Sequence, residues 1–201
     1  MRLPPRSGDQ IRIGVAIPVP DPFAAGLQSA RARFGDPLAD SIPPHVTLLG
    51  PTVVEPDGLA AVSEHLERVA ARADPFMLHL RGTGSFRPVS PVVFVQVAQG
   101  IAHCERLERA VRSGPLAQTL RFNYHPHVTV AHEVPEDALD RAFAELAQYE
   151  ARFPVTSFQV YEHGDDGVWR PVRDFPLDGG APAAVGSATA GAGDARVGDH
   201  S

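Results

Sequence analysis

Several features that would define a class of protein are missing from this 201-residue chain. It has a single cysteine, Cys104, so no disulfide can form within it. No apolar run approaches the ~18 residues that a membrane span needs. The opening segment, Met1–Arg6, is too short and too rich in proline for the apolar part of a secretory signal. We therefore expect a cytoplasmic protein without a membrane partner.

An excess of positive charge is also missing, because the formal net charge is -6 at pH 7. An acidic chain is poorly suited to hold extended double-stranded nucleic acid by electrostatics. A small phosphorylated ligand or the end of an RNA chain remains compatible, since such a site needs positive charge only locally. The composition, 43% hydrophobic and 21% charged, is typical of a globular protein with one well-buried domain.

Two short segments carry the same pattern of histidine and threonine. His45 and Thr47 are separated by one valine, and His127 and Thr129 repeat this arrangement later in the chain. Both segments are rich in residues that favour β-strands. Side chains alternate between the two faces of a strand, so each histidine shares a face with its threonine while the aliphatic neighbours point to the other face. Two such strands brought together would form a polar pocket with two imidazoles and two hydroxyls.

The periodicity of apolar residues predicts strands and helices in alternation. Each motif strand is followed by a helix and then a strand, which indicates a weak internal duplication and two related halves that face each other. We expect a loose lead-in over 1–9, a single domain over 10–178 and a disordered tail over 179–201. In the helices we expect His65 to be exposed, and Leu139, Phe143 and Leu146 to point inward. Strands are predicted at 11–20, 76–86, 92–97, 153–163 and 168–177, and helices at 21–34, 59–73, 101–112 and 135–146.

The residue types of the two motifs suit the chemistry of phosphate esters. Two imidazoles with pKa values near ~6.5 can act at neutral pH as an acid and a base. Two threonine hydroxyls can donate hydrogen bonds to phosphate oxygens as charge develops on them. Neither motif contains a carboxylate, which a hard divalent cation would prefer. The residues therefore favour a phosphodiester reaction without a metal or other cofactor.

The paired motifs, Pro44–Leu48 and Pro126–Val130, resemble those of the two-histidine (2H) phosphoesterase superfamily. Within it they are most similar to the bacterial 2′-5′ RNA ligase-like branch. The proline before each histidine, Tyr124 before the second motif and Gly50-Pro51 after the first also fit, and the likeness covers about residues 11–177. This resemblance implies a bilobal α+β fold, in which two pseudo-symmetric strand-helix-strand lobes with antiparallel-rich sheets face a central groove.

The resemblance also implies an activity and roles for the motif residues. The substrate would be a 2′,3′-cyclic phosphate at an RNA end or on a small nucleotide, opened to a 2′-phosphate. Some members of the family join or cleave 2′-5′ RNA linkages. His45 and His127 become the acid and base, with the first donating to the leaving 3′ oxygen and the second activating water. Thr47 and Thr129 become the phosphate clamps.

Residues before the second motif are candidates for binding the substrate. Tyr124 could stack on a base, Arg121 could supply positive charge, and His125 could border the pocket or tune the histidine pair. Two alternatives stay open: a module that binds phosphorylated nucleotides without turnover, and a metallohydrolase built on His125 and His127 with His132 close by. We expect a monomer, because the duplication already supplies both halves of the pocket.

Overall fold

The computed structural model describes residues 3–179, and these form two four-stranded sheets and four α-helices. The lead-in up to Gln10 has no regular element, and residues 180–201 of the expected tail lie outside the described part. No helix of residues 3–179 is long and apolar enough to cross a membrane. In chain order the elements are β1 (Ile11–Pro18), α1 (Phe23–Phe34), β2 (His45–Val54), α2 (Leu59–Ala70), β3 (Phe76–Ser85), β4 (Val92–Gln99), α3 (Ile101–Val111), β5 (His127–His132), α4 (Glu136–Glu145), β6 (Glu150–Val155), β7 (Ser157–His163) and β8 (Trp169–Pro176), with short 3-10 turns at Pro56–Gly58 and Gly114–Leu116.

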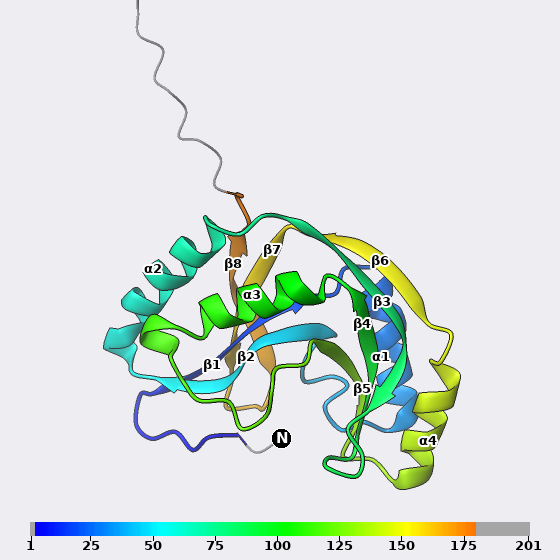
Figure 1. The fold of residues 1–201 in the computed structure, drawn as a ribbon. Coiled ribbons are helices and arrows are strands. Elements are labelled where there is room, and N and C mark those ends of the chain that lie inside the picture. The colour runs from blue at the N-terminus through cyan, green and yellow to red at the C-terminus, as the bar shows by residue number, and fades with distance from the viewer. Residues whose placement is uncertain (1–2, 180–201) are drawn as a thin grey trace, which may run out of the picture.

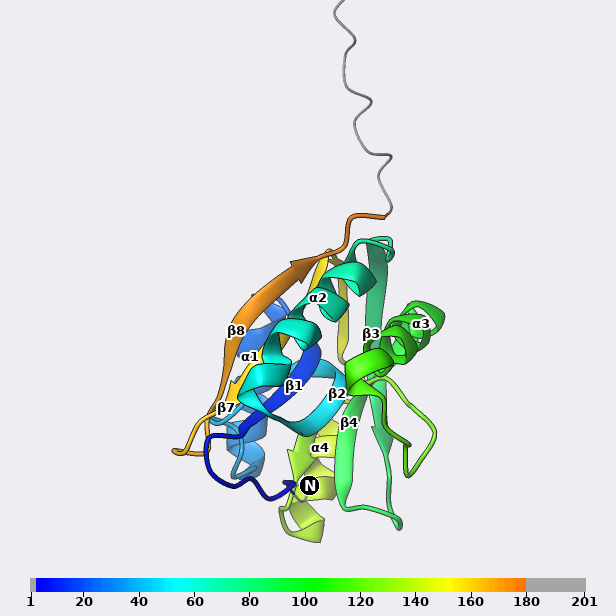
Figure 2. The same ribbon diagram turned by 90° about the vertical axis from the view of Figure 1, so that its left-hand side faces the viewer.

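The two sheets have the same plan, and in each the strand that carries a motif lies at an edge. The first sheet has the order β2-β1-β7-β8 and the second β5-β4-β3-β6, with every neighbouring pair antiparallel. In the view turned by 90°, β7 and β8 lie on the opposite side of the molecule from β3 and β4 (Figure 2). The expected bilobal α+β fold with antiparallel sheets is confirmed.

The unit that both sheets share is a strand, a helix and then the motif strand: β1-α1-β2 in the first and β4-α3-β5 in the second. The helices of the two units are exchanged. Helix α1 packs against β5 and α4, while α3 packs against β2 and α2 (Figure 1). Each motif strand is therefore covered by the helix that precedes the other motif.

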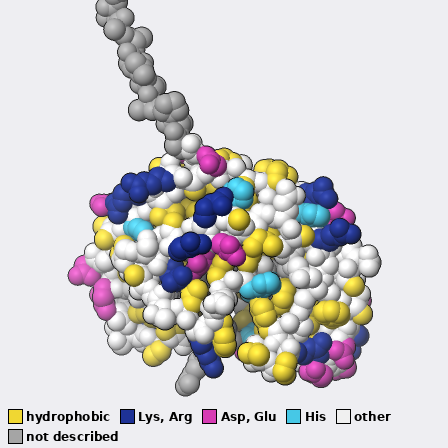
Figure 3. Space-filling model, in the orientation of Figure 1, with side chains coloured by type: hydrophobic (Ala, Val, Ile, Leu, Met, Phe, Trp, Pro, Cys, Tyr) yellow, Lys and Arg dark blue, Asp and Glu magenta, His cyan; other side chains and the backbone are white. Residues whose placement is uncertain are grey.

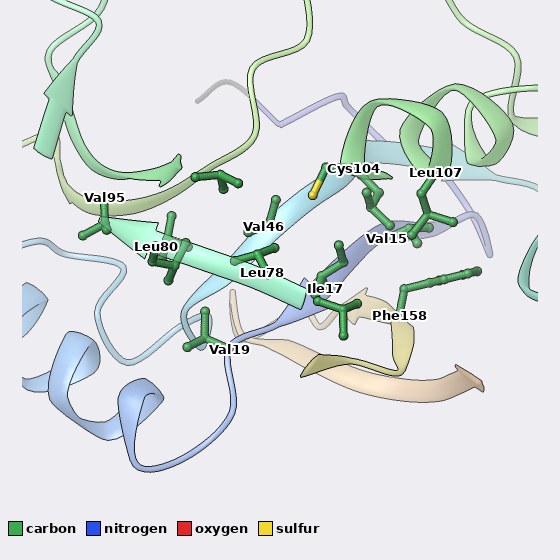
Figure 4. Packing of buried hydrophobic residues seen from close by; sticks show 14 of the residues in the cluster. Val15, Ile17, Val19, Val46, Leu78, Leu80, Val95, Cys104, Leu107 and Phe158 are labelled. Atoms are coloured by element: carbon green, nitrogen blue, oxygen red, sulfur yellow. The ribbon is translucent and has the colours of Figure 1, made fainter. Parts of the chain in front are cut away.

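One hydrophobic cluster joins the two sheets and the helices. Figure 4 shows side chains from both sheets and from α3 meeting in it, among them Val15, Ile17, Phe158, Leu78, Leu80, Val95, Cys104 and Leu107. Cys104 is fully buried, and burial raises the pKa of its thiol to about 12, so it acts as a small apolar side chain. The two lobes thus share a core, which fixes the relative position of their motif strands.

The expected strand over 153–163 and the expected orientation of Phe143 are both wrong. The single strand expected over 153–163 is two strands, because the chain leaves the second sheet at Val155, passes Thr156 and enters the first sheet as β7. Helix α4 buries the face with Ala138, Leu139 and Ala142, so Phe143 is 41% exposed instead of pointing inward. The small alanines allow the helix to approach the sheet closely, and this rotates Phe143 outward.

Candidate functional site

The two motif strands contact each other although they belong to different sheets. Strands β2 and β5 lie side by side where their first residues meet (Figure 1). Their burial patterns begin identically: the histidine and threonine of each motif are half-buried, and the aliphatic residues beside them are buried. Figure 3 shows histidine side chains in the middle of this face, with a hollow beside them. The expected alternation therefore holds in both copies.

The backbone fixes both imidazoles in the same way. Nδ1 of His45 lies 2.8 Å from the carbonyl oxygen of Pro43, and Nδ1 of His127 lies 2.7 Å from the carbonyl oxygen of His125. A carbonyl can only accept, so in both rings Nδ1 carries the proton and donates it. Within residues 3–179 neither Nε2 is bonded to another residue. Each ring therefore presents Nε2 for proton transfer.

Burial acts on both histidines against the charged form. The pKa of His45 is lowered to about 4, mainly by burial, with a smaller contribution from the positive charges of Arg31 and His127. The pKa of His127 is lowered too, first by burial and then by the charge of His125. The hydrogen bonds to the backbone carbonyls oppose these shifts without cancelling them. Both imidazoles are therefore neutral at pH 7 in the free protein.

Neither threonine hydroxyl of the motifs is bonded to another residue of the described chain. Thr47 and Thr129 lie on the same strand faces as the histidines and are partly exposed. Hydroxyls in this position can donate to an anion that sits against the Nε2 atoms. The four motif residues are thus brought to one place with their polar atoms free.

Aromatic rings border His127. The rings of Phe86 and Phe94 lie 4.9 and 5.0 Å from its imidazole, centroid to centroid. A glycine is needed behind them, because a Cβ at Gly84 would lie 2.5 Å from the Phe94 ring. On the other lobe, the Tyr161 ring lies 6.4 Å from His45. These apolar surroundings are the source of the burial that keeps the imidazoles uncharged.

Tyr124 connects the two motifs directly. Its hydroxyl donates a 3.0 Å hydrogen bond to the carbonyl oxygen of Thr47, although Tyr124 itself precedes the second motif. The ring packs against the hydrophobic core, and burial raises the pKa of its phenol. The structure thus gives Tyr124 a bridging contact, and its stacking on a base stays a prediction.

His125 and Arg121, the other two candidates for binding the substrate, lie in different places. His125 is exposed, with its ring 6.2 Å from that of His127 and 5.4 Å from that of Phe94. Arg121 is also exposed, and its guanidinium lies over the Phe122 ring at 5.1 Å. Arg121 lines a separate 640 Å³ cavity next to α3, which neither motif histidine lines. His125 therefore belongs to the histidine cluster and Arg121 to its surroundings, while their part in binding stays a prediction.

A buried ion pair that the sequence analysis missed supports the first motif. Arg31 of α1 donates to Asp36 from Nε at 3.2 Å and from Nη2 at 3.0 Å, and it donates to the carbonyl oxygen of Ile42 at 3.3 Å. Both charged side chains are buried. The signal was present in the sequence, because Arg31 lies four residues after Leu27 and so on the apolar face of its helix.

Among residues 3–179 no group of three or more histidine, cysteine, aspartate or glutamate side chains could hold a metal ion. His132 lies at the end of β5, and its pKa is lowered mainly by burial. The metallohydrolase alternative built on His125 and His127 thus has no third ligand within the described chain.

Comparisons with known proteins identify relatives over most of the chain. Residues 19–167 match the family described as the 2′-5′ RNA ligase superfamily. A protein of Halalkalibacterium halodurans, provisionally named as a phosphoesterase, is 28% identical over 166 residues, which are 82% of this chain and 96% of that protein. One of Bacillus thuringiensis strain Al Hakam, named in the same way, is 28% identical over 154 residues, covering 75% of this chain and 87% of its own.

Solved structures share the fold. Escherichia coli LigT, crystallised with 3′-AMP, superposes with a TM-score of 0.64 at 20% identity, covering 84% of this chain and 99% of LigT. A Thermus thermophilus protein, TT0787, has a TM-score of 0.52 at 26% identity, covering 84% of this chain and 98% of that protein. The overall fold of this chain is therefore shared with these proteins.

Proposed function

The chain belongs to the 2′-5′ RNA ligase superfamily, a group of 2H phosphoesterases, and from this premise we propose that it opens 2′,3′-cyclic phosphates to 2′-phosphates without a metal. The observation that carries the proposal is the pair of imidazoles on adjoining strands, each with Nδ1 held by a backbone carbonyl and Nε2 free. The substrate is an RNA end or a small cyclic nucleotide, and a single chain supplies the whole site. Joining of 2′-5′ RNA linkages is part of the same proposal: a 5′ hydroxyl takes the place of water in the attack on phosphorus, and the same bond to the 3′ oxygen breaks.

The proposed reaction needs one neutral and one protonated imidazole. Nε2 of His127 accepts a proton from water as the water oxygen attacks phosphorus. The bond between phosphorus and the 3′ oxygen breaks, and Nε2 of His45 donates its proton to that oxygen. Thr47 and Thr129 donate hydrogen bonds to the non-bridging oxygens, where negative charge grows. The product is a 2′-phosphate with a free 3′ hydroxyl, and the proton taken from water balances the proton given to the leaving group.

Binding of the anionic substrate favours the protonated imidazole that the reaction needs. Both imidazoles have lowered pKa values in the free protein, so few molecules carry a proton on either ring at pH 7. A phosphodiester anion placed against them favours the charged form of one ring. Since kcat/KM reports the free protein, we expect its pH profile to be a bell with its maximum below pH ~6.5. A maximum above pH 7 would contradict this mechanism.

The direct test is turnover of 2′,3′-cyclic AMP in excess EDTA. We expect His45→Ala and His127→Ala to lower kcat/KM by ~10²–10⁴-fold each, because each removes one proton transfer. Full activity in either variant would overturn the proposal. Saturable binding of 2′-AMP to the wild-type protein, with no turnover under any condition, would identify the pocket as a binding module.

A second substrate distinguishes the acid from the base. An aryl phosphodiester with a nitrophenol leaving group needs little protonation as that group departs. We therefore expect His45→Ala to retain much more activity on the aryl ester than on the cyclic nucleotide, whereas His127→Ala loses both. The opposite pattern would exchange the two roles.

A further inference from the structure

A second cavity lies away from the motif histidines, between α2 and α3. These helices contact each other and run next to each other in both ribbon views (Figures 1 and 2). The cavity has a volume of 480 Å³, which falls in the range of ~300–1,000 Å³ that is common for small-molecule sites. None of the four motif residues lines it. Its chemistry can therefore be considered separately from the proposed reaction.

Positive charge is concentrated at this cavity. Arg68 and Arg72 line it from one side and Arg106 from the other, and Asp74 is the single acidic residue in the lining. Arg72 and Arg106 have no ion-pair partner within residues 3–179, and Arg68 has only a loose one, Glu64 at 3.9 Å. Three guanidinium groups and one carboxylate in the lining give this cavity a local positive charge, in a protein whose net charge is -6.

The geometry of the guanidinium group suits a phosphate, although the use of arginine is not special to this cavity, because all 18 basic residues of the chain are arginines. A guanidinium is planar and can donate two parallel hydrogen bonds to a phosphate or carboxylate. Groups on both sides of a cavity can hold a dianionic phosphate from two directions.

A histidine buried in the wall offers a further polar atom. His65 was expected to be exposed from its acidic neighbours, but it is only 8% exposed because α3 packs over it. Its Nε2 donates to the carbonyl oxygen of Val111 at 3.1 Å. In the neutral ring Nδ1 is then the acceptor, and it lies beside Gly114 at the cavity, with no partner in the described chain.

A flat platform completes the lining. The imidazole of His103 stacks on the Phe76 ring, with centroids 4.8 Å apart and planes inclined by 13°. Phe76 is buried and His103 is exposed, so the outer face of the imidazole is open. Such a face can take an aromatic ring by stacking.

We propose that this cavity is a second, non-catalytic binding site for a nucleoside monophosphate. The phosphate lies between the guanidiniums of Arg72 and Arg106, the base stacks on His103, and Nδ1 of His65 accepts a hydrogen bond from a ligand hydroxyl or amino group. This site stands independently of the proposed phosphodiesterase reaction, because the two share no lining residue.

The test is calorimetric titration of adenosine 5′-monophosphate into the His45→Ala/His127→Ala protein, followed by amide chemical shifts. We expect binding that shifts the amides of His103 and Gly114. Arg72→Ala should weaken it about tenfold, and Arg72→Ala/Arg106→Ala about 100-fold, because each charge-assisted hydrogen bond contributes on the order of a tenfold factor. Adenosine and ribose 5-phosphate should each bind more weakly than the complete nucleotide.

The control is Arg81→Ala, which removes an exposed arginine from a different surface, on β3, where its charge acts on Glu150. It should leave the affinity unchanged. Equal affinity in the Arg72→Ala/Arg106→Ala protein, no binding at all, or shifts confined to the motif strands would overturn the proposed site. The same two substitutions in the wild-type background should leave turnover of 2′,3′-cyclic AMP intact, so failure of this site and failure of the proposed reaction are distinguishable.

Discussion

The lowered pKa of His45 makes a quantitative prediction about stability. In the folded protein the imidazole takes up its proton near pH 4, and in the unfolded chain near its ordinary value of about 6.5. Between these two values the unfolded state binds a proton that the folded state does not. The free energy of unfolding therefore falls as the pH is lowered from 6.5 to 4, and His45 has no such effect at pH 7, where both states are neutral.

The size of the effect follows from the same two values. Each pH unit between them corresponds to about 1.4 kcal/mol, so this histidine costs the folded protein about 3 kcal/mol at pH 4. The substitution His45→Asn removes the titrating ring and keeps a side-chain amide that can donate to the carbonyl oxygen of Pro43. The variant should therefore lose about 3 kcal/mol less than the wild type between pH 7 and pH 4.

Urea denaturation followed by circular dichroism at these two pH values measures the difference. Other groups titrate in both proteins and cancel in the comparison. The free energy of unfolding of His127→Asn should also fall less than that of the wild type between pH 7 and pH 4, because burial lowers the pKa of that ring as well. Parallel pH dependence of the wild type and His45→Asn would refute the assignment of a desolvated, neutral imidazole at this position.

Two further substitutions test the contacts that hold the motifs in place. Tyr124→Phe removes the hydrogen bond to the Thr47 carbonyl and should lower the free energy of unfolding by about 1 kcal/mol, measured by urea denaturation. It should also lower kcat on 2′,3′-cyclic AMP, because the contact between the two motifs is lost. Arg31→Met leaves the buried carboxylate of Asp36 without its partner and should cost about 3–5 kcal/mol in the same denaturation assay.

Matched controls exist for both. Tyr149→Phe removes a hydroxyl that is buried without a hydrogen-bond partner, so it should not destabilise the protein. Arg33→Ala breaks an exposed ion pair with Glu145 and a contact of the guanidinium with the Phe34 ring, and it should change the free energy of unfolding by ~0–1 kcal/mol. If either control lost as much stability as its test variant, the contact in question would not be the cause.

The features that follow from local pattern were predictable from the sequence. The alternation of His45 and Thr47 with buried valine and leucine needs only the two-residue period of a strand, and the burial of Cys104 needs only the period of a helix. The break at Thr156 was missed although the sequence carries a signal for it, because the apolar alternation changes phase there: Phe153 and Val155 are followed by Phe158 and Val160. The partnership of Arg31 with Asp36 depends on a turn that closes after the helix, which periodicity does not describe.

Because each lobe's helix covers the motif strand of the other lobe, we expect the two lobes to unfold together. Detachment of α1 would expose β5, and detachment of α3 would expose β2. Local unfolding of the helix in one lobe therefore exposes the motif strand of the other lobe. We expect amide protons of both motif strands to exchange with solvent in one concerted opening, and a chain cut between β3 and β4 to assemble its site only when both pieces are present. We therefore expect both imidazoles to become exposed to solvent in the same opening event.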